Sequence, residues 1–384
     1  SATITIFSND ASDRNSIGGT LSGAAGVTAT YAGALELALA KILPPGIPGV
    51  RTNVGAGASG RLALTGQITD SRAGLRLEKV GDGTVVLGNA GNDYGGGTTI
   101  GAGTLETTFV GALPKDGAVT VEKNGVLDLK GFNQSIGTLL GAGSVDLGGG
   151  TLTVGKGNFT GQFVVKTPGS TAGHLEKTSV ETLILGNSNT LESTTIQGGK
   201  LTAGDGKALG DGSVMVEEGG TLEIATKDEL TLGPSKKITI VGNNKSDQNS
   251  VGGTLSGAAG VDASYGGALE LAKHVSSGGD RTNVGAGAGG KLILKGEIAN
   301  QGGGALTKVG DGTVALTHAN TTYTGETTIK EGTLRAEDRK ALGDGSVKIE
   351  EGGTLEIATT ELTLGPSATI TIFSNDASDR NSIG

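Results

Sequence analysis

The sequence contains no cysteine and no tryptophan, and it is poor in the large side chains that fill a conventional globular core. Among 384 residues there are 7 proline, 4 tyrosine, 6 phenylalanine and 1 methionine. Without cysteine, disulfide bonds and thiolate metal sites are excluded. With so few aromatic residues, any core must be aliphatic. This composition favours a stack of small, similar layers over a single compact domain.

Clustered basic residues and long apolar runs are also missing. The net charge is −9, and lysine and arginine are scattered among aspartate and glutamate, which argues against a nucleic-acid partner. No apolar run approaches the ~20 residues needed to cross a bilayer, so we expect no membrane insertion by this segment. The sequence starts at Ser1 without the basic and apolar regions of a signal peptide, which we therefore expect to be absent or removed.

Glycine and repetition are what the chain has in abundance. Glycine accounts for 73 residues, without the strict Gly-X-Y period of collagen. Residues 1–18 (SATITIFSNDASDRNSIG) recur letter for letter as residues 367–384, and a diverged copy that begins at Ser235 matches them at 10 of 18 positions. Internal repetition of this kind is typical of solenoids and tandem arrays.

The repeats divide the chain into units. Unit A covers residues 1–234 and unit B covers residues 235–366, each ending in the phrase TLGP, and residues 367–384 begin the next 366-residue repeat. A smaller module occurs three times, from Leu77, Leu175 and Leu306. Unit A contains two of these modules and unit B contains one, which largely explains their different lengths.

Within the module, apolar and polar residues alternate with a period of two, as in half-buried strands. In GSVKIEEGGTLEIA, Val347 and Ile349 should face the same side as Leu355 and Ile357. Equivalent strands recur with spacings of 20 and 21 residues, at Thr313, Thr333 and Thr354. Strands of one such coil cannot bury their apolar faces alone, but stacked coils can. The sequence therefore predicts an all-β parallel β-helix with coils of about twenty residues.

One segment fits a helix as well as a strand. In Tyr31–Leu43 the leucines match both periods, and we favour a strand. The Pro44-Pro45-Gly46 that follows breaks either element, so a loop at Ile42–Val50 should protrude from the solenoid, with its counterpart at Ser276–Asp280.

The amino-acid sequence of the modules resembles that of a known family. LTKVGDGTVALTHANTTYTGETTIKEGTLRAED, from Leu306, is similar to the passenger-associated transport repeat of bacterial autotransporters, and Gly141–Phe163 resembles the coils between such repeats. The resemblance implies a right-handed parallel β-helix that is secreted across the outer membrane of a Gram-negative bacterium. It also implies an extracellular location, either displayed on the bacterial cell surface or released.

Glycine-rich motifs could indicate a nucleotide site, but they have a structural interpretation. Gly55–Gly60 (GAGASG) and Gly285–Gly290 (GAGAGG) match G-x-G-x-x-G, yet strand-like sequence follows each, where a dinucleotide site needs a helix N-terminus. We interpret both as close-packed coil corners. Gly-Asp-Gly sequences should also form tight corners, with aspartates at Asp82, Asp211, Asp311 and Asp344.

Candidate metal ligands and bases are sparse. The best oxygen-rich cluster for calcium consists of Asn9, Asp10, Ser12, Asp13 and Asn15, but in the second copy Asn244 replaces the first aspartate. We favour an Asx-turn loop there; a ladder or a corner cap formed by Asn15 and its counterpart Asn249 is the alternative. The three histidines never occupy repeated positions: His174, His274 and His318. We assign no catalytic, cofactor-binding or metal-ligating residue.

Three functions remain open. The first is a non-catalytic β-solenoid of an extracellular bacterial filament or surface fibre, whose partner is a further copy of itself, because an unpaired coil end is a template for the next coil. That copy could follow in one giant chain or stack as a separate chain. The second is an adhesin whose loops bind a cell-surface or glycan ligand. The third and least favoured is a polysaccharide-degrading β-helix enzyme, which would need converging carboxylates that the sequence does not identify.

Overall fold

The structure is a computed structural model that describes residues 3–7, 19–38, 51–71, 74–166, 171–242, 253–272, 281–300, 304–318 and 322–373. All regular secondary structure in these ranges is β-strand. The chain forms two compact units, residues 1–176 with 189–192, and residues 177–188 with 193–384. The boundary between the sequence units A and B lies within the second of them.

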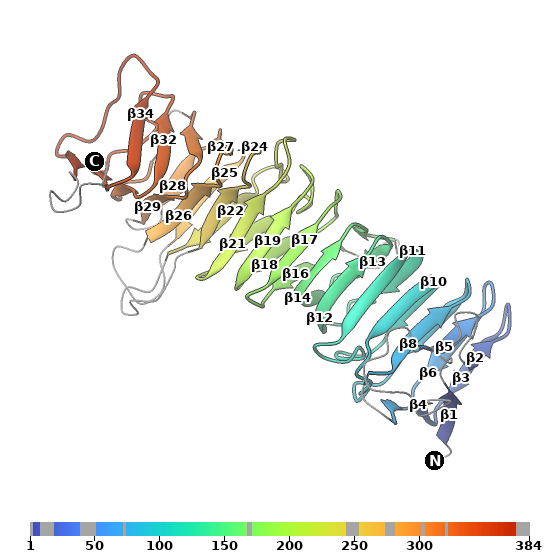
Figure 1. Cartoon of the computed structure of the whole chain (residues 1–384). Helices are drawn as coiled ribbons and strands as arrows, with labels where there is room; N and C mark the ends of the chain where they lie inside the picture. Colours follow the sequence, from blue (N-terminus) through green and yellow to red (C-terminus); the bar gives the residue numbers. More distant parts are fainter. Residues whose placement is uncertain are drawn as a thin grey trace. The chain divides into compact units, whose positions relative to one another are not determined.

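The strands of the first unit form three ladders, and within each ladder the strands of successive turns pair in parallel (Figure 1). The first ladder contains β1 (Thr3–Phe7), β4 (Ala34–Ala38) and β7 (Ile68–Asp70). The second contains β2 (Thr20–Gly23), β5 (Arg51–Ala56), β8 (Arg76–Val80), the first parts of β10 (Thr98–Thr107) and β11 (Ala118–Asp128), β12 (Gln134–Gly141) and β14 (Thr151–Phe159). The third contains β3 (Thr28–Tyr31), β6 (Arg61–Leu64), β9 (Thr84–Leu87), the remaining parts of β10 and β11, β13 (Ser144–Asp146) and β15 (Gln162–Val164). The next strand, β16 (His174–Lys177), spans the division between the units.

The second unit repeats this arrangement with three parallel ladders (Figure 1). The first contains β18 (Ser193–Ile196), β20 (Ser213–Val216), β22 (Lys237–Val241), β25 (Ala268–Ala272) and β28 (Ile298–Asn300). The second contains β17 (Thr182–Leu185), β19 (Gly199–Ala203), β21 (Gly220–Ile224), β23 (Thr254–Gly257), β26 (Arg281–Ala286), β29 (Ala305–Val309), β31 (Thr327–Ile329), β33 (Val347–Ile349) and β35 (Ile370–Ile372). The third contains β24 (Asp262–Tyr265), β27 (Lys291–Leu294), β30 (Thr313–Leu316), β32 (Gly332–Ala336) and β34 (Gly353–Ile357).

The predicted parallel β-solenoid is therefore confirmed, down to a register read from the sequence. Thr313 pairs with Thr333, which pairs with Thr354. Coil length is about twenty residues in the repeat modules but varies elsewhere. It falls to 18 residues where Val126 pairs with Ser144, and it rises to 33 where Thr20 pairs with Asn53. The longest coils carry extra chain between their first and second strands.

The core is aliphatic and is built by period-two alternation. In β17, Leu183 and Leu185 are fully buried, whereas Ile184 between them is partly exposed. Parallel stacking places each buried residue over its counterpart one coil away, so that Leu183 pairs with Leu201. Each strand thus contributes only two or three apolar side chains. The predicted strand in Tyr31–Leu43 is confirmed as β4, and the remainder of that segment, residues 39–43, lies outside the described residues.

Candidate functional site

A buried lysine marks the same position in all three repeat modules. It is the third residue of LEKV, LEKT and LTKV, and its side chain is fully buried in each: Lys79, Lys177 and Lys308. Each follows a buried leucine at a spacing of two, so the alternation of the strand turns the lysine inward. These residues were not recognised from the sequence, although their repetition and their inward phase were a usable signal.

Each buried ammonium group is held by backbone carbonyl oxygens from two coils. Lys79 Nζ donates to Gly81 O at 2.6 Å in its own coil and to Ala102 O at 2.8 Å in the next. Lys308 Nζ does the same with Gly310 O at 2.5 Å and Glu331 O at 2.8 Å. Lys177 Nζ donates to Ser179 O and, at 3.0 Å, to Gly198 O. The lysines therefore tie successive coils together at one corner.

Glycine is required beside each lysine. The carbonyl that accepts the inter-coil bond always precedes a glycine with positive φ, at Gly103 (65°), Gly199 (61°) and Gly332 (61°). A Cβ on Gly103 would lie 2.5 Å from Gly81 O and 2.7 Å from Lys79 Nζ. A larger residue would therefore push apart the carbonyl groups that surround the lysine.

Burial changes the acidity of these groups. Desolvation lowers the pKa of Lys79, Lys177 and Lys308 to about 8 each, against a smaller opposing effect of nearby carboxylates such as Asp82. The role of these buried, carbonyl-bound lysines is structural, because their ammonium groups are not accessible to a ligand.

A tyrosine is buried at an equivalent corner in two modules, just before β10 and just before β31. Tyr94 is 1% exposed, and its hydroxyl bonds Thr98 Oγ1 at 2.8 Å; Tyr323 is fully buried and bonds Thr327 in the same way. Desolvation raises the pKa of both phenols well above the ordinary value. In the second module Leu191 takes this place, also buried.

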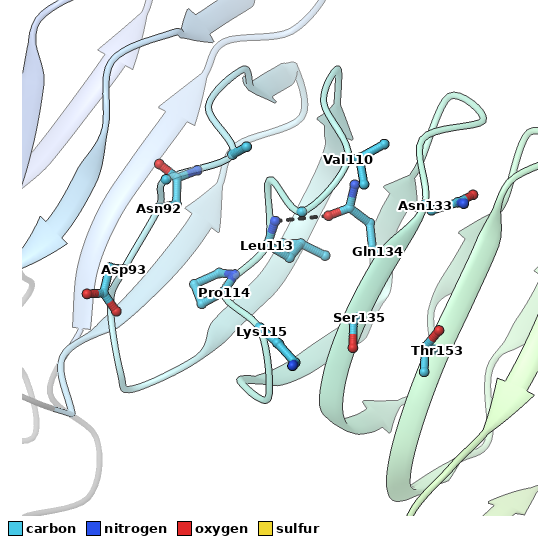
Figure 2. A pocket seen from close by; sticks show the side chains of 13 residues that line it. Asn92, Asp93, Val110, Leu113, Pro114, Lys115, Asn133, Gln134, Ser135 and Thr153 are labelled. Carbon is cyan, nitrogen blue, oxygen red and sulfur yellow. Dashed lines mark hydrogen bonds between the residues drawn. The ribbon is translucent and has the colours of Figure 1, made fainter. Parts of the chain in front are cut away.

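A cavity of about 540 Å³ opens on the first unit (Figure 2). Four successive coils build it. Its walls come from the corners before β10 and β11 and from the starts of β12 and β14, and they include Asn92, Asp93, Pro114, Lys115, Ser135 and Thr153. The lining of this cavity includes polar residues, with one negatively charged residue, Asp93, and one positively charged residue, Lys115.

Amide side chains in the cavity wall join the coils. Asn92 accepts a hydrogen bond from Ile68 N at 2.9 Å and donates to Ala112 O at 2.8 Å. Gln134 accepts from Leu113 N at 3.0 Å, the contact drawn in Figure 2, and donates to Phe109 O at 2.7 Å. These amides are therefore committed to the fold, whereas Asp93 and Lys115 are the charged groups of the lining.

Exposed apolar side chains lie at the corners next to this cavity. We call Phe109, Val110 and Phe132 the corner patch; they are 55%, 61% and 36% exposed. Gln134 Nε2 bonds the carbonyl oxygens of both Phe109 and Phe132, which places the two corners side by side. Val110 also lines the cavity.

The glycine-rich corners behave as predicted from the sequence. Gly55–Gly60 joins β5 to β6, and Gly285–Gly290 joins β26 to β27. A Cβ on Gly60 would lie 2.3 Å from Ala24 O, and one on Gly290 would lie 2.3 Å from Ala258 O, so the coils are in close contact there. The Gly-Asp-Gly sequences around Asp82, Asp211, Asp311 and Asp344 form corners in which the first glycine has positive φ, at Gly81, Gly210, Gly310 and Gly343.

Two carboxylates are stacked in adjacent coils, a feature that was not identified from the sequence. Asp128 pairs with Asp146 in the ladder, and both are buried. Each accepts the amide two residues ahead, from Lys130 N at 2.9 Å and Gly148 N at 3.0 Å. Desolvation, and to a smaller extent the neighbouring Asp146, raise the pKa of Asp128. Their hydrogen bonds identify them as turn-forming groups.

The other predicted positions give no convergent site. Among the described residues no group of three or more His, Asp or Glu side chains could hold a metal ion. His174 begins β16 and His318 follows β30, both half-buried. The calcium cluster at 9–15, Asn249, His274 and both predicted loops, Ile42–Val50 and Ser276–Asp280, lie outside the described residues. The described part of the chain contains no helix with the length and apolar character of a membrane span.

Comparisons with known proteins agree with the repeat pattern. The passenger-associated transport repeat model matches residues 77–106, 175–203 and 306–336. The chain is 30% identical to the adhesin BmaC autotransporter of Brucella suis biovar 1 (strain 1330) over 274 residues, which cover 69% of this chain and 8% of that protein. No solved structure matches the chain.

Proposed function

We propose that this chain, a β-solenoid segment of an autotransporter passenger built on passenger-associated transport repeats, is a non-catalytic structural element that continues head to tail into a further copy of itself. Its place is the bacterial cell surface or the extracellular space, following the type of its relative, an adhesin autotransporter. The chain spans 8% of that relative, whose length would accommodate many such segments in series.

The pairing of three related strands carries the proposal. In β22, Ile238 pairs with Val214 on one side and with Leu269 on the other. The equivalent residue of β35, Ile370, pairs with Val347 on the first side, and that of β1, Ile4, pairs with Leu35 on the second. We call the joint between units A and B, where β22 pairs on both sides, the internal junction. Because residues 367–384 repeat residues 1–18, one strand with the partners of both β35 and β1 would reproduce this junction.

Hydrogen exchange on a tandem chain tests this continuation. The tandem consists of residues 1–384 followed directly by residues 19–384. We expect the amides of residues 370–372 at the joint to become as protected as those of residues 238–240 in the same molecule, because they gain a second ladder partner. Protection at the joint no greater than in the single chain would contradict the proposal.

The cavity lining supports the non-catalytic part of the proposal. Glycoside hydrolysis needs two carboxyl groups across one site, and in the described lining of the cavity Asp93 is the one carboxylate. Turnover of a bacterial or host polysaccharide by the purified chain, lost on Asp93→Asn, would contradict this part.

A second candidate function is adhesion through the corner patch. Its three exposed apolar side chains border a cavity that carries both charges, an arrangement suited to contact with another surface. Beads coated with the chain should attach to cultured epithelial cells, and Phe109→Ser with Val110→Ser and Phe132→Ser should abolish attachment. Val180→Ser is the matched control, because Val180 is 90% exposed outside the patch. Undiminished attachment by the triple variant would remove the patch from consideration.

A further inference from the structure

The same five residues, GTLEI, occur in two strands with different surroundings. In β21, Leu222 and Ile224 are fully buried, because β19 covers one edge and β23 the other. In β34, Leu355 is half-buried and Ile357 is 51% exposed. The ladder of β34 continues to β32, and no other described strand pairs with it. An apolar face that is interior in one copy is therefore open in the other.

The first coil shows the complementary open face. Leu21 in β2 and Tyr31 in β3 are half-buried, whereas their equivalents, Leu255 in β23 and Tyr265 in β24, are 0% and 1% exposed. The difference again follows position, because β23 has β21 beneath it and Tyr265 forms a bridge with Leu230. The first described coil and the last one thus each expose residues whose equivalents beside β22 are buried.

We infer that the open face of β34 is covered by Gly19–Gly23 of a following copy, in the register Thr354 to Thr20, Leu355 to Leu21, Glu356 to Ser22 and Ile357 to Gly23. This inference rests on the proposed head-to-tail continuation and specifies its contact. The register is that of the internal junction, where Thr221 pairs with Thr254 and Ile224 with Gly257. The sequences on both sides are the same, GTLEI facing GTLSG. The same superposition brings Leu362 to Tyr31, as Leu230 meets Tyr265.

The following copy belongs to the same polypeptide. Strand β35 already occupies the free edge of β33, through Ile370 and Ile372. A separate chain would bring its own residues 4–6, with identical sequence, to that edge and would have to displace β35. In a continuous chain there is no such competition, because residues 367–384 themselves serve as the first eighteen residues of the next copy.

Disulfide trapping in the tandem chain tests the register. Thr354→Cys in the first copy is combined with Thr20→Cys in the second; directly paired strand residues lie about 4.8 Å apart, within disulfide range. The shifted control combines Thr354→Cys with Ser22→Cys, about 8 Å apart and beyond that range. Thr221→Cys with Thr254→Cys provides the positive control at the internal junction, where the pairing is known. A mixture of two single chains, one carrying each cysteine, tests the separate-chain arrangement.

We expect near-complete crosslinking in the matched tandem and the positive control, and only background in the shifted pair and the mixture. Preferential crosslinking of the shifted pair, with the joint still protected from hydrogen exchange, would overturn the register and leave the head-to-tail function intact. An unprotected joint with no crosslink in either tandem would overturn both. Efficient crosslinking in the mixture would overturn the single-polypeptide assignment.

Discussion

Lys79 Nζ donates a hydrogen bond of 2.8 Å to the carbonyl oxygen of Ala102, which lies 23 residues further along the chain and one coil away. Lys308 makes the same contact with Glu331, and Lys177 makes it with Gly198. In a solenoid each coil contacts only its neighbouring coils. A charged group that binds carbonyl oxygens of two coils therefore stabilises the local step between them.

These lysines make stability depend on pH. Their pKa is about 8 in the folded chain against 10.5 for the ordinary group, so between these values the unfolded chain binds more protons and stability rises with pH. The effect is up to about 3 kcal/mol per lysine. We expect the urea midpoint to increase from pH 8 to pH 10. Replacing all three residues by methionine should remove the increase, and an unchanged slope in that variant would assign it to other groups.

Gly103 is expected to tolerate no side chain. Gly103→Ala would impose a left-handed φ on alanine and place a methyl group 2.5 Å from Gly81 O. The expected loss is at least about 2 kcal/mol, with faster hydrogen exchange in β10. Gly101→Ala is the matched control in the same strand, because its Cβ would meet Lys79 O at an ordinary 3.4 Å. Equal losses in the two variants would contradict the requirement for glycine beside the lysine.

The buried tyrosine contributes through its hydroxyl as well as its ring. Tyr94→Phe leaves Thr98 Oγ1 without its 2.8 Å partner and should cost about 1 kcal/mol in urea denaturation. The double variant with Thr98→Val removes both polar groups, so part of that loss should return. Strictly additive losses would show that the two hydroxyl groups do not interact.

Much of the fold could be predicted from the sequence because a solenoid is locally encoded. The alternation within each module gave the inward and outward residues, and the 20- and 21-residue spacings gave the register from Thr313 to Thr354. The buried lysines were harder to recognise. Their phase points inward, but a buried charge is accepted only when acceptors surround it. Those acceptors are main-chain oxygens of another coil, which side-chain patterns do not reveal.

The cavity and the coil lengths were missed for related reasons. Asp93, Lys115 and Thr153 are far apart in sequence and line one cavity only because four coils stack. The 33-residue step from Thr20 to Asn53 includes chain with no period of its own, so counting modules underestimates the coil length there.

The repeated GTLEI provides its own control for the open face of β34. Ile224→Asp places a carboxylate in a fully buried position between β21 and β23 and should cost several kcal/mol, about 3 or more. Ile357→Asp makes the same change where the side chain is 51% exposed, so the single chain should lose less than about 1 kcal/mol. In the tandem chain, Gly23 of the following copy would cover Ile357, and the two substitutions should become similarly destabilising. Urea denaturation of both variants in both chains separates the outcomes, and an Ile357→Asp loss that stays small in the tandem would mean that this face remains open to solvent.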